Sequence, residues 1–501
     1  MKLYDLAVIG GGINGAGIAR DAAGRGLSVL LAEQGDLASA TSSASTKLIH
    51  GGLRYLEHYK FRLVRESLRE RALLLKLAPH LVRPMRFVLP HIGLRAPWKL
   101  RLGFRLYDWF GRTPGLPASR VLDLADDPAG APLKEGFGLG FEYSDCVADD
   151  ARLVIANAIG AREKGADIRT RTRCVSARRE HGSWQLVLQT GGGNREIVTA
   201  RALVNATGPW VARTQETILR QKVATAVRLV KGSHIVLPRL HAHDRAYLLP
   251  NDDGRLVFAI PYGGDYTLVG TTEVEVSEHS TEATASSEEI LYLCKIVSRF
   301  FRTQVKPSAV KWTFAGIRTL VDDGRTRPSE VMRDYWIDTG GRYGEPPLLS
   351  IYGGKLTTYR SLAEKVVDRL KSWMVVGPAW TGDEPLPGGD LGAGGVEELV
   401  AAIVSLHPYV SAPLARRLAR SYGTRVWTVL GDAQSAGDLG PRLVGDLHAR
   451  ELDYLRREEW ALTADDVLWR RTKLGLHAKD GEIDALRGIL AAGKPAEKLA
   501  G

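Results

Sequence analysis

The stretch Leu6-Ala7-Val8-Ile9-Gly10-Gly11-Gly12-Ile13-Asn14-Gly15 decides the fold, because an apolar run leads directly into the spacing Gly-x-Gly-x-x-Gly. Gly10 allows the tight turn that leaves the strand, Gly12 lets the backbone approach a pyrophosphate, and Gly15 lets the next helix pack close to the sheet. An alanine-rich helical pattern follows, and a second apolar run ends in Glu33, which is placed to accept hydrogen bonds from ribose hydroxyls. The sequence therefore predicts a Rossmann-like unit that binds a dinucleotide through Gly10, Gly12, Asn14, Gly15 and Glu33.

Two further segments favour FAD over a nicotinamide dinucleotide. Residues 40–55 offer many hydroxyls and small-residue amides just after the ribose position, and residues 202–210 form an apolar strand that stops at a small-residue turn. A third segment, 353–359, is a strand-to-helix turn whose amides can reach a flavin ring. No second glycine fingerprint follows a strand, which disfavours a flavin reduced by a separate NADPH. We expect FAD to contact Thr41, Ser42, Ser43, Ser45, Lys47, Leu48, His50, Gly51, Val175, Ala206, Thr207, Gly208, Gly354, Lys355, Leu356 and Thr357.

Composition excludes several classes of protein. With 501 residues the chain can bury a large core in more than one domain. The net charge of +11 is moderate and dispersed, which suits anionic ligands or an anionic membrane face, and no motif supports nucleic-acid binding. Three widely spaced cysteines indicate buried thiols in a reducing cytoplasm, and no Cys/His cluster has metal-ligand spacing, so no metal is expected. We see no signal peptide, and no apolar run approaches the length of a membrane span.

The pattern of elements predicts an α/β chain (α+β overall) with three parts. Residues 1–385 form an FAD-dependent oxidoreductase core, in which segments of about 1–75, 150–230 and 330–385 build a Rossmann-like FAD-binding domain. Segments of about 76–149 and 231–329 build a substrate domain on an antiparallel sheet. A glycine-rich linker near residues 388–395 precedes a C-terminal α-helical domain, which spans residues 386–501. Thr463 is expected to cap a helix there.

The matched motifs resemble the aerobic, FAD-dependent glycerol-3-phosphate dehydrogenases over nearly the whole chain. They lie at residues 5–35, 41–59, 141–146, 231–236, 270–272, 353–359 and 465–471. The resemblance implies oxidation of sn-glycerol 3-phosphate to dihydroxyacetone phosphate, with electrons passing through FAD to ubiquinone or menaquinone. It also implies a cytoplasmic protein that associates peripherally with the inner face of the cytoplasmic membrane, and a homodimer is kept as a candidate assembly. Two departures are Glu273, where the family leads us to expect Asp, and the loop at residues 261–265.

The implied reaction needs a base, a cation near the developing alkoxide and a cradle for a phosphate dianion. The resemblance places catalytic roles on Arg54, Arg318, His234 and Lys355, with His234 as the base because a neutral imidazole accepts a proton near pH 7. Lys355 can also stabilise negative charge at the flavin or on the substrate oxygen. His50 is expected near the flavin, with its role left open. Substrate binding is assigned to Arg54, Tyr55, Thr272, Arg318 and Arg333, since arginine donates two parallel hydrogen bonds to phosphate.

Residues 97–112 carry Trp98 and Trp109 among apolar and basic residues at helical spacing. Such a helix either lies in a bilayer interface or packs on the core, and both interpretations stay open. Two rival functions also stay open at this point. One is an FAD-dependent amine or amino-acid oxidase of the same superfamily, which needs a carboxylate clamp. The other is a non-catalytic flavin-binding scaffold.

Overall fold

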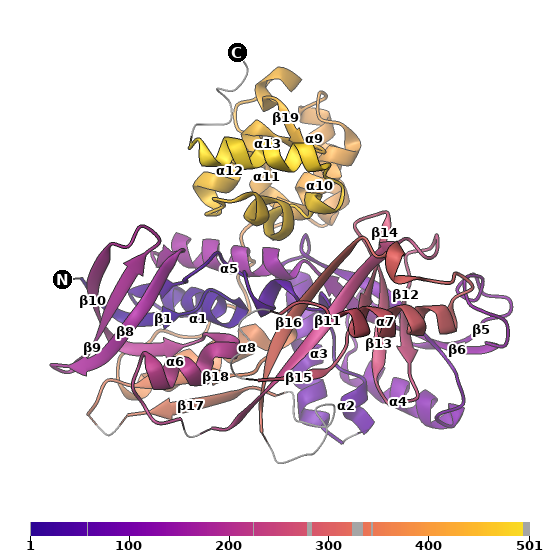
Figure 1. The fold of residues 1–501 in the computed structure, drawn as a ribbon, viewed down its shortest axis with the longest axis horizontal. Helices are drawn as coiled ribbons and strands as arrows, with labels where there is room; N and C mark the ends of the chain where they lie inside the picture. Colours follow the sequence, from indigo (N-terminus) through magenta and orange to yellow (C-terminus); the bar gives the residue numbers. More distant parts are fainter. Residues whose placement is uncertain are drawn as a thin grey trace.

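The computed structural model of the protein describes residues 2–57, 59–223, 225–277, 283–322, 334–341 and 344–493, apart from the side chains of Arg54 and Glu57. Within these residues the chain forms two large sheets that lie side by side and a mostly helical C-terminal domain that sits across them (Figure 1). The predicted fold class is confirmed: a Rossmann-like domain, a mainly antiparallel sheet domain and a helical domain.

The first sheet contains the glycine fingerprint at the end of its central strand. Among the described residues its strand order is β17-β18-β10-β1-β2-β7, and the hairpin β8–β9 pairs with β10. β1 (Leu3–Ile9) runs parallel to both β2 (Val29–Ala32) and β10 (Arg195–Asn205), as in a dinucleotide-binding fold. The other strands are β7 (Asp167–Arg169), β8 (Thr172–Glu180), β9 (Ser183–Thr190), β17 (Trp336–Gly340) and β18 (Leu348–Tyr352).

The apolar run in β1 is continuous because the strand is buried on both faces. Leu6 and Val8 pack into the cluster formed with helices α1 (Ile13–Gly24), α5 (Asp150–Glu163) and α8 (Tyr359–Arg369). Ala7 and Ile9 point the other way and pack into a second cluster with residues of β8, β9 and β10. Alternate side chains of a strand face opposite sides of its sheet, so two buried faces require an unbroken apolar segment.

The second sheet carries the residues expected to bind substrate. Its order in the described chain is β15-β11-β14-β13-β12-β4-β6-β3, with β16 paired to β11 and β5 to β6. Within this second sheet, β12 and β4 are the only parallel pair among the described strand pairs. The strands are β3 (Leu48–Ile49), β4 (Val82–Pro90), β5 (Arg120–Asp123), β6 (Leu139–Ala148), β11 (Val227–Pro238), β12 (Ala246–Pro250), β13 (Leu256–Tyr262), β14 (Tyr266–Gly270), β15 (Val274–Val276) and β16 (Trp312–Val321).

One short strand departs from the predicted division of the chain. β3 lies in segment 1–75, which we assigned to the FAD-binding domain, yet it pairs with β6 of the second sheet. The strand follows the hydroxyl-rich loop at residues 40–47, so that loop runs from one sheet to the other. The remaining helices of the core are α2 (Arg54–Glu57), α3 (Phe61–Leu77), α4 (Pro97–Phe110), α6 (Val211–Thr217), α7 (Ser287–Phe300) and the short turns η1 (Thr41–Ser43), η2 (Gly208–Trp210), η3 (Pro307–Ala309), η4 (Leu356–Thr358) and η5 (Leu370–Ser372).

The C-terminal domain has its own apolar core and is less purely helical than expected. Its helices are α9 (Gly395–Leu406), α10 (Ala412–Tyr422), α11 (Val426–Leu430), α12 (Ala449–Glu458), α13 (Asp480–Ala491), the π-helical turn η8 (Asp466–Arg471) and the short turns η6 (Gly423–Arg425), η7 (Ala436–Leu439) and η9 (Leu474–Leu476). A small hairpin of β19 (Arg442–Val444) and β20 (Leu447–His448) interrupts them. The Thr463 hydroxyl accepts a hydrogen bond from the Asp466 N–H, as the predicted cap requires.

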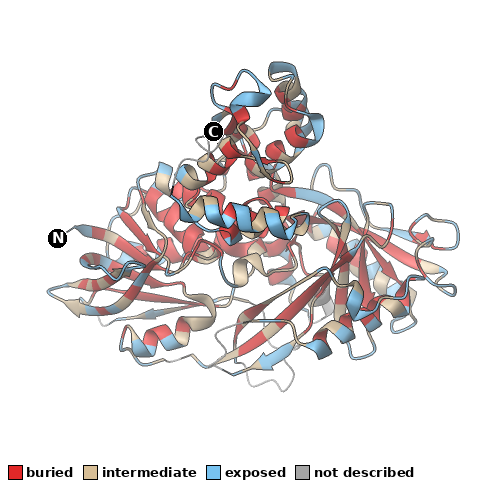
Figure 2. Ribbon diagram, turned by 45° about the horizontal axis from the view of Figure 1, so that its top comes forward, coloured by how far each residue is buried: buried red, intermediate tan, exposed pale blue. Residues whose placement is uncertain are grey.

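The distribution of buried residues follows the sheets and the helices that pack on them. Buried residues fill the strands of both sheets and the inner faces of the helices, whereas loops and the outer faces of the C-terminal helices are exposed (Figure 2). Cys146, Cys174 and Cys294 are all buried. No helix in the described part of the chain combines the length and apolar character needed to cross a bilayer.

Candidate active site

A cavity of about 1610 Å³ runs between the two sheets. It begins at the glycine turn after β1, passes the loop at residues 38–50, and ends among side chains of β13 and α4. Because its walls come from both sheets, the cavity can hold a dinucleotide on one domain and a small substrate against the other.

Each of the three fingerprint positions requires glycine for a different structural reason. Gly10 has a φ of +109°, and a Cβ there would lie 2.5 Å from the Ala206 carbonyl oxygen. A Cβ on Gly15 would lie 1.9 Å from the Gly10 carbonyl oxygen, so only glycine lets α1 start this close to β1. Gly12 lines the cavity immediately before α1, whose positively polarised N-terminus favours a phosphate.

Glu33 is fixed at the end of β2 by two backbone amides. The Gly11 N–H donates to its Oε2 at 2.6 Å, and the Gly35 N–H donates to its Oε1 at 2.7 Å. Burial raises the pKa of Glu33, although these amide hydrogen bonds oppose the rise. Each carboxylate oxygen keeps a second lone pair, so the group can still accept bonds from ribose hydroxyls in the cavity it lines.

The strand-to-helix turn after β18 forms the part of the cavity wall next to Asn14. The Asn14 Nδ2 donates to the Gly353 carbonyl at 3.1 Å, and the buried Asn14 Oδ1 has no hydrogen-bond partner in the described part of the chain. A Cβ on Gly354 would lie 3.0 Å from the Asn14 amide nitrogen. The turn therefore leaves a polar, side-chain-free wall suited to a flavin ring.

Most of the predicted cofactor and substrate residues line the cavity. They are Gly10, Gly12, Asn14, Glu33, Thr41, Ser42, Ser45, Leu48, His50, Tyr55, Val175, Ala206, Thr207, Gly208, Arg318, Gly354, Lys355, Leu356 and Thr357. Of the predicted residues whose side chains the structure describes, six do not line it: Gly15, Ser43, Lys47, Gly51, His234 and Thr272.

Lys47 is turned away from the cavity by an ion pair. Its ammonium donates to both carboxylate oxygens of Asp150, at 2.8 and 2.9 Å, and to the Ser43 carbonyl at 2.9 Å. The Ser45 hydroxyl also donates to Asp150, at 2.8 Å. Neither Lys47 nor Ser43 lines the cavity, and their assignment to FAD stays a prediction. Gly51 packs against Leu68 and donates its N–H to the Tyr107 hydroxyl.

His234 lies behind the cavity wall. Its side chain is fully buried and stacked on Phe314, with ring centroids 4.8 Å apart, and Nε2 lies 3.0 Å from the Thr46 hydroxyl. Burial, followed by the charges of Arg318 and Lys47, holds the pKa of His234 well below its usual value. Thr46 lines the cavity whereas His234 does not, and the assignment of His234 as the base stays a prediction.

Thr272 is likewise occupied elsewhere. Its hydroxyl donates to Glu289 at 2.7 Å and accepts the Ser233 N–H at 2.9 Å. Its neighbour Thr271 lines the cavity in its place. Both threonines lie between the end of β14 and the start of β15, where no strand alternation predicts which of them faces a ligand, and the hydrogen bond to Glu289 of α7 fixes Thr272.

Two cations stand at the far end of the cofactor cavity beside Tyr55. The Lys355 ammonium lies 4.0 Å from the centroid of the Tyr55 ring and, within the described chain, has no hydrogen-bond partner although it is buried. Arg318 Nη2 lies 3.4 Å from the Thr271 hydroxyl, and Nη1 lies 3.9 Å from Glu273. A Cβ on Gly232 would lie 2.9 Å from Arg318 Nη2, so glycine there leaves room for the guanidinium.

Two predicted arginines fall outside the description. The side chain of Arg54 and all of Arg333 lie outside the described residues. Their assignment to the substrate phosphate stays a prediction.

Sequence reasoning missed three groups of site residues. Thr46 lines the cavity in front of His234, Asp150 anchors the cofactor loop, and an apolar wall extends the cavity. That wall includes Leu94, Trp98, Leu102, Leu256 and Phe258. No local sequence pattern connects Asp150 with Lys47, 103 residues away.

Comparison with known proteins decides the family. A family model described as FAD dependent oxidoreductase matches residues 5–360, and one described as the C-terminal domain of alpha-glycerophosphate oxidase matches residues 379–495. The chain is 53% identical over 477 residues to a glycerol-3-phosphate dehydrogenase of Pseudomonas aeruginosa, covering 95% of this chain and 92% of that protein. The chain belongs to the glycerol-3-phosphate dehydrogenase family of FAD-dependent oxidoreductases.

Two other members show how far the likeness extends. This dehydrogenase-family chain is 48% identical over 484 residues to a D-erythritol 1-phosphate dehydrogenase of Brucella abortus, covering 95% of this chain and 96% of that protein. The structure of the glycerol-3-phosphate dehydrogenase from Bacillus halodurans complexed with FAD matches with a TM-score of 0.74 at 28% identity, covering 98% of this chain and 94% of that one. The predicted family and cofactor are confirmed.

The residues present fit FAD. The glycine turn and Glu33 suit the pyrophosphate and ribose, and the open Asn14 Oδ1 and the buried Lys355 ammonium face the space where a flavin ring would lie. A buried ammonium without a partner is costly, so a negatively polarised ligand atom is expected beside it.

Proposed function

We propose that the protein oxidises sn-glycerol 3-phosphate to dihydroxyacetone phosphate. The observation that carries the proposal is the pair of cations, Arg318 and Lys355, beside Tyr55 in a cavity shared with the glycine fingerprint. A phosphate dianion and a developing alkoxide both need such cations, because charge-assisted hydrogen bonds are strongest where water is excluded. Arg54 and Arg333 are the further phosphate ligands that we propose.

The reaction removes a hydride from C2 and a proton from the C2 hydroxyl, and the C2 oxygen becomes a carbonyl. Bound FAD supplies the hydride acceptor, and we propose that the two electrons then pass to ubiquinone or menaquinone. Lys355 stabilises the oxygen while its proton leaves. His50 lines the cavity, so we propose it, in place of His234, as the group that takes this proton. General-base assistance of this kind contributes roughly 100- to 10,000-fold to a rate.

Anaerobic titration of the yellow holoenzyme tests the substrate. Glycerol 3-phosphate should bleach the flavin absorbance near about 450 nm, a band that belongs to the cofactor. An amino-acid oxidase would instead respond to amino acids, and a non-catalytic scaffold would respond to neither. Absence of bleaching by glycerol 3-phosphate would refute the proposal.

D-Erythritol 1-phosphate is the second candidate substrate, because a relative at 48% identity carries that name. Its extra CHOH group lies at the end remote from the phosphate, so the phosphate and C2 contacts would be shared. A kcat/KM for glycerol 3-phosphate that exceeds the value for D-erythritol 1-phosphate by tenfold or more supports the first candidate. The reverse ratio supports the second.

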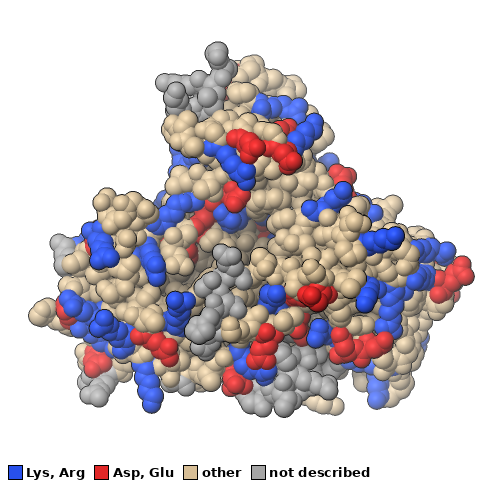
Figure 3. Space-filling view, viewed as in Figure 1, with Lys and Arg blue, Asp and Glu red and all other residues tan. Residues whose placement is uncertain are grey.

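We further propose a peripheral association with the inner face of the cytoplasmic membrane through α4. The helix buries Phe104 and Tyr107 against the core, while Trp98, Leu102 and Trp109 are 62%, 51% and 74% exposed. It lies on the side of the molecule remote from the C-terminal domain (Figure 1). Exposed tryptophans beside basic residues are suited to a bilayer interface. Elsewhere, on the face seen in Figure 3, basic and acidic side chains intermingle.

The same helix supports a route for the quinone. Trp98 and Leu102 are exposed on the surface and also line the apolar end of the cavity. A quinone that leaves the bilayer beside α4 would therefore meet an apolar path toward the flavin.

Vesicle binding tests the membrane proposal. Replacing Trp98 and Trp109 by serine should weaken sedimentation with phosphatidylglycerol vesicles at least tenfold. Trp336→Ser is a matched control, because Trp336 is 54% exposed on β17 of the first sheet. Equal binding by the double variant and the control would contradict the proposal.

A further inference from the structure

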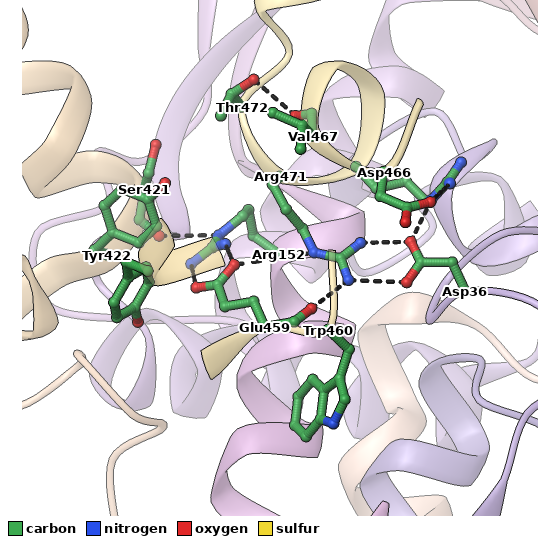
Figure 4. A network of polar contacts seen from close by, with 12 residues as sticks. Asp36, Arg152, Ser421, Tyr422, Glu459, Trp460, Asp466, Val467, Arg471 and Thr472 are labelled. Atoms are coloured by element: carbon green, nitrogen blue, oxygen red, sulfur yellow. Dashed lines mark hydrogen bonds and ion pairs between the residues drawn. The ribbon is translucent and has the colours of Figure 1, made fainter. Parts of the chain in front are cut away.

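A buried network of ion pairs joins the C-terminal domain to the cofactor domain. Its centre is η8 (Asp466–Arg471), the π-helical turn with the sequence Asp466-Val467-Leu468-Trp469-Arg470-Arg471 (Figure 4). Neither the reaction nor the membrane association uses this segment. A π-helical turn is uncommon and often marks a functional position, so its partners indicate what the domain does.

Asp36 is the acceptor at which the two domains meet. Arg471 donates to both of its carboxylate oxygens, at 2.5 and 2.9 Å (Figure 4). Arg470 Nε donates to Asp36 at 2.6 Å. The side chains of Arg471 and Asp36 are 0% and 2% exposed. Removing one partner of such a buried pair leaves an uncompensated charge, so the pair is coupled tightly.

Asp36 belongs to the loop that presents Glu33 to the cofactor. The loop continues from Glu33 through Gly35, whose N–H binds the Glu33 carboxylate, to Ala38, whose N–H donates to the Gly11 carbonyl at 3.1 Å. Gln34, Gly35, Ala38 and Ser39 all line the cavity. A change in the position of Asp36 is therefore expected to alter the ribose site, which lies only two to three residues away in the same loop.

A second set of bonds holds the same domain to α5 and to β8. Lys473 donates to Asp149 at 2.8 Å, and Glu459 forms an ion pair with Arg152 through both carboxylate oxygens. Asp466 pairs with Arg171, which precedes β8. Burial would raise the pKa of Asp466, but the amides of Leu462 and Thr463, the Thr463 hydroxyl and Arg171 lower it to about 2, so it is charged at neutral pH.

We propose that the C-terminal domain is a clamp on the adenosine half of the FAD site, with Arg470 and Arg471 as positioning residues that act through Asp36. The clamp holds the loop at residues 33–39 in the conformation that binds FAD. Cofactor retention and domain docking are then thermodynamically linked, and the coupling has the same size in both directions. The proposal rests on FAD as the cofactor.

FAD release from the holoenzyme tests the clamp. After dilution, FAD fluorescence reports the rate at which the quenched, bound cofactor leaves. Arg471→Met should speed release at least tenfold, equivalent to about 1.4 kcal/mol. Asp36→Asn should have a similar effect, and the double variant should be no worse than either single variant, because both substitutions break the same Asp36–Arg471 pair. If Arg471→Met does not fold, Arg470→Gln keeps the test, since that side chain is 16% exposed at the edge of the network.

Arg417→Met is the matched control. Arg417 is a C-terminal-domain arginine that pairs with Glu451 through two bonds of 2.7 Å inside that domain. It should change the FAD release rate less than twofold. A reciprocal readout is proteolysis in the linker near residues 388–395, which added FAD should slow in the wild type and not in Arg471→Met.

Three results would overturn the clamp: wild-type release rates in folded Arg471→Met, equal acceleration by Arg417→Met, or additive effects of Asp36→Asn and Arg471→Met. The wild-type control separates the clamp from the cofactor assignment. A wild-type protein from which denaturation liberates no FAD refutes the cofactor, whereas one that after dilution releases FAD at the variant's rate refutes the clamp.

Discussion

The Lys47–Asp150 ion pair offers a sharp test of how the cofactor loop is held. Lys47 is 7% exposed and Asp150 is fully buried, and the ammonium lies 2.8 and 2.9 Å from the two carboxylate oxygens. Asp150→Asn leaves the ammonium buried without a counter-charge, and breaking a buried pair from one side costs about 3–5 kcal/mol. Asparagine keeps one oxygen acceptor, so we expect the free energy of unfolding to fall by about 3 kcal/mol, a roughly 100-fold change in the folding equilibrium.

The loss should appear in two assays. Urea unfolding at a fixed FAD concentration measures the stability, and the ratio of flavin to protein absorbance measures the FAD content, which should fall because Ser45 and Thr46 line the cavity in the same loop. Lys47→Met combined with Asp150→Leu removes both charges and should recover most of the stability. The reasoning is refuted if Asp150→Asn costs less than 1 kcal/mol, or if the double variant is no more stable than the single one.

Three further predictions concern the fingerprint, the buried histidines and the base. Gly15→Ala should purify without FAD, as absorbance would show, because its Cβ would lie 1.9 Å from the Gly10 carbonyl oxygen. Burial, then a nearby arginine, lowers the pKa of His80 from 6.5 to about 3. The unfolded chain therefore binds a proton that the folded chain does not. The free energy of unfolding falls by about 1.4 kcal/mol per pH unit as the pH drops from 6.5 toward 3. Measured by urea unfolding between pH 6 and 5, the free energy of unfolding of His80→Leu should depend on pH less steeply than that of the wild type, by that amount. His50→Gln should lower kcat about 100-fold or more with little change in KM, whereas His234→Gln should lower kcat less than tenfold, and the opposite order in steady-state kinetics would restore His234 as the base.

The sequence was most informative where the backbone alone decides the structure. The turn at Gly10 and the approach at Gly15 have no tolerance for a side chain, so the glycine spacing predicts them directly. The Rossmann-like FAD-binding domain and the antiparallel substrate sheet follow from the pattern of elements, and the structure has both. The β-α-β unit and the cofactor class can therefore be predicted from the sequence alone.

Side-chain destinations were less accessible, because they depend on partners that are distant in sequence. Lys47 lies in a hydroxyl-rich loop that suits a ligand, yet its ammonium forms an ion pair with Asp150. His234 lies in a matched motif, but its ring occupies the space left by Gly270, where a Cβ would lie 2.0 Å from the imidazole. The hairpin β19–β20 escaped prediction because strands of two and three residues give no measurable alternation.

The bond from Asn14 to Gly353 joins residues 339 positions apart in the chain. A ribosome that has just released the fingerprint must synthesise both sheets before the partner turn exists, so the nascent N-terminus waits with an unfinished nucleotide site. Contacts of such long sequence separation slow folding and prolong the exposure of apolar strands. We therefore expect FAD to bind late in folding, only after the chain as far as Gly353 has been synthesised.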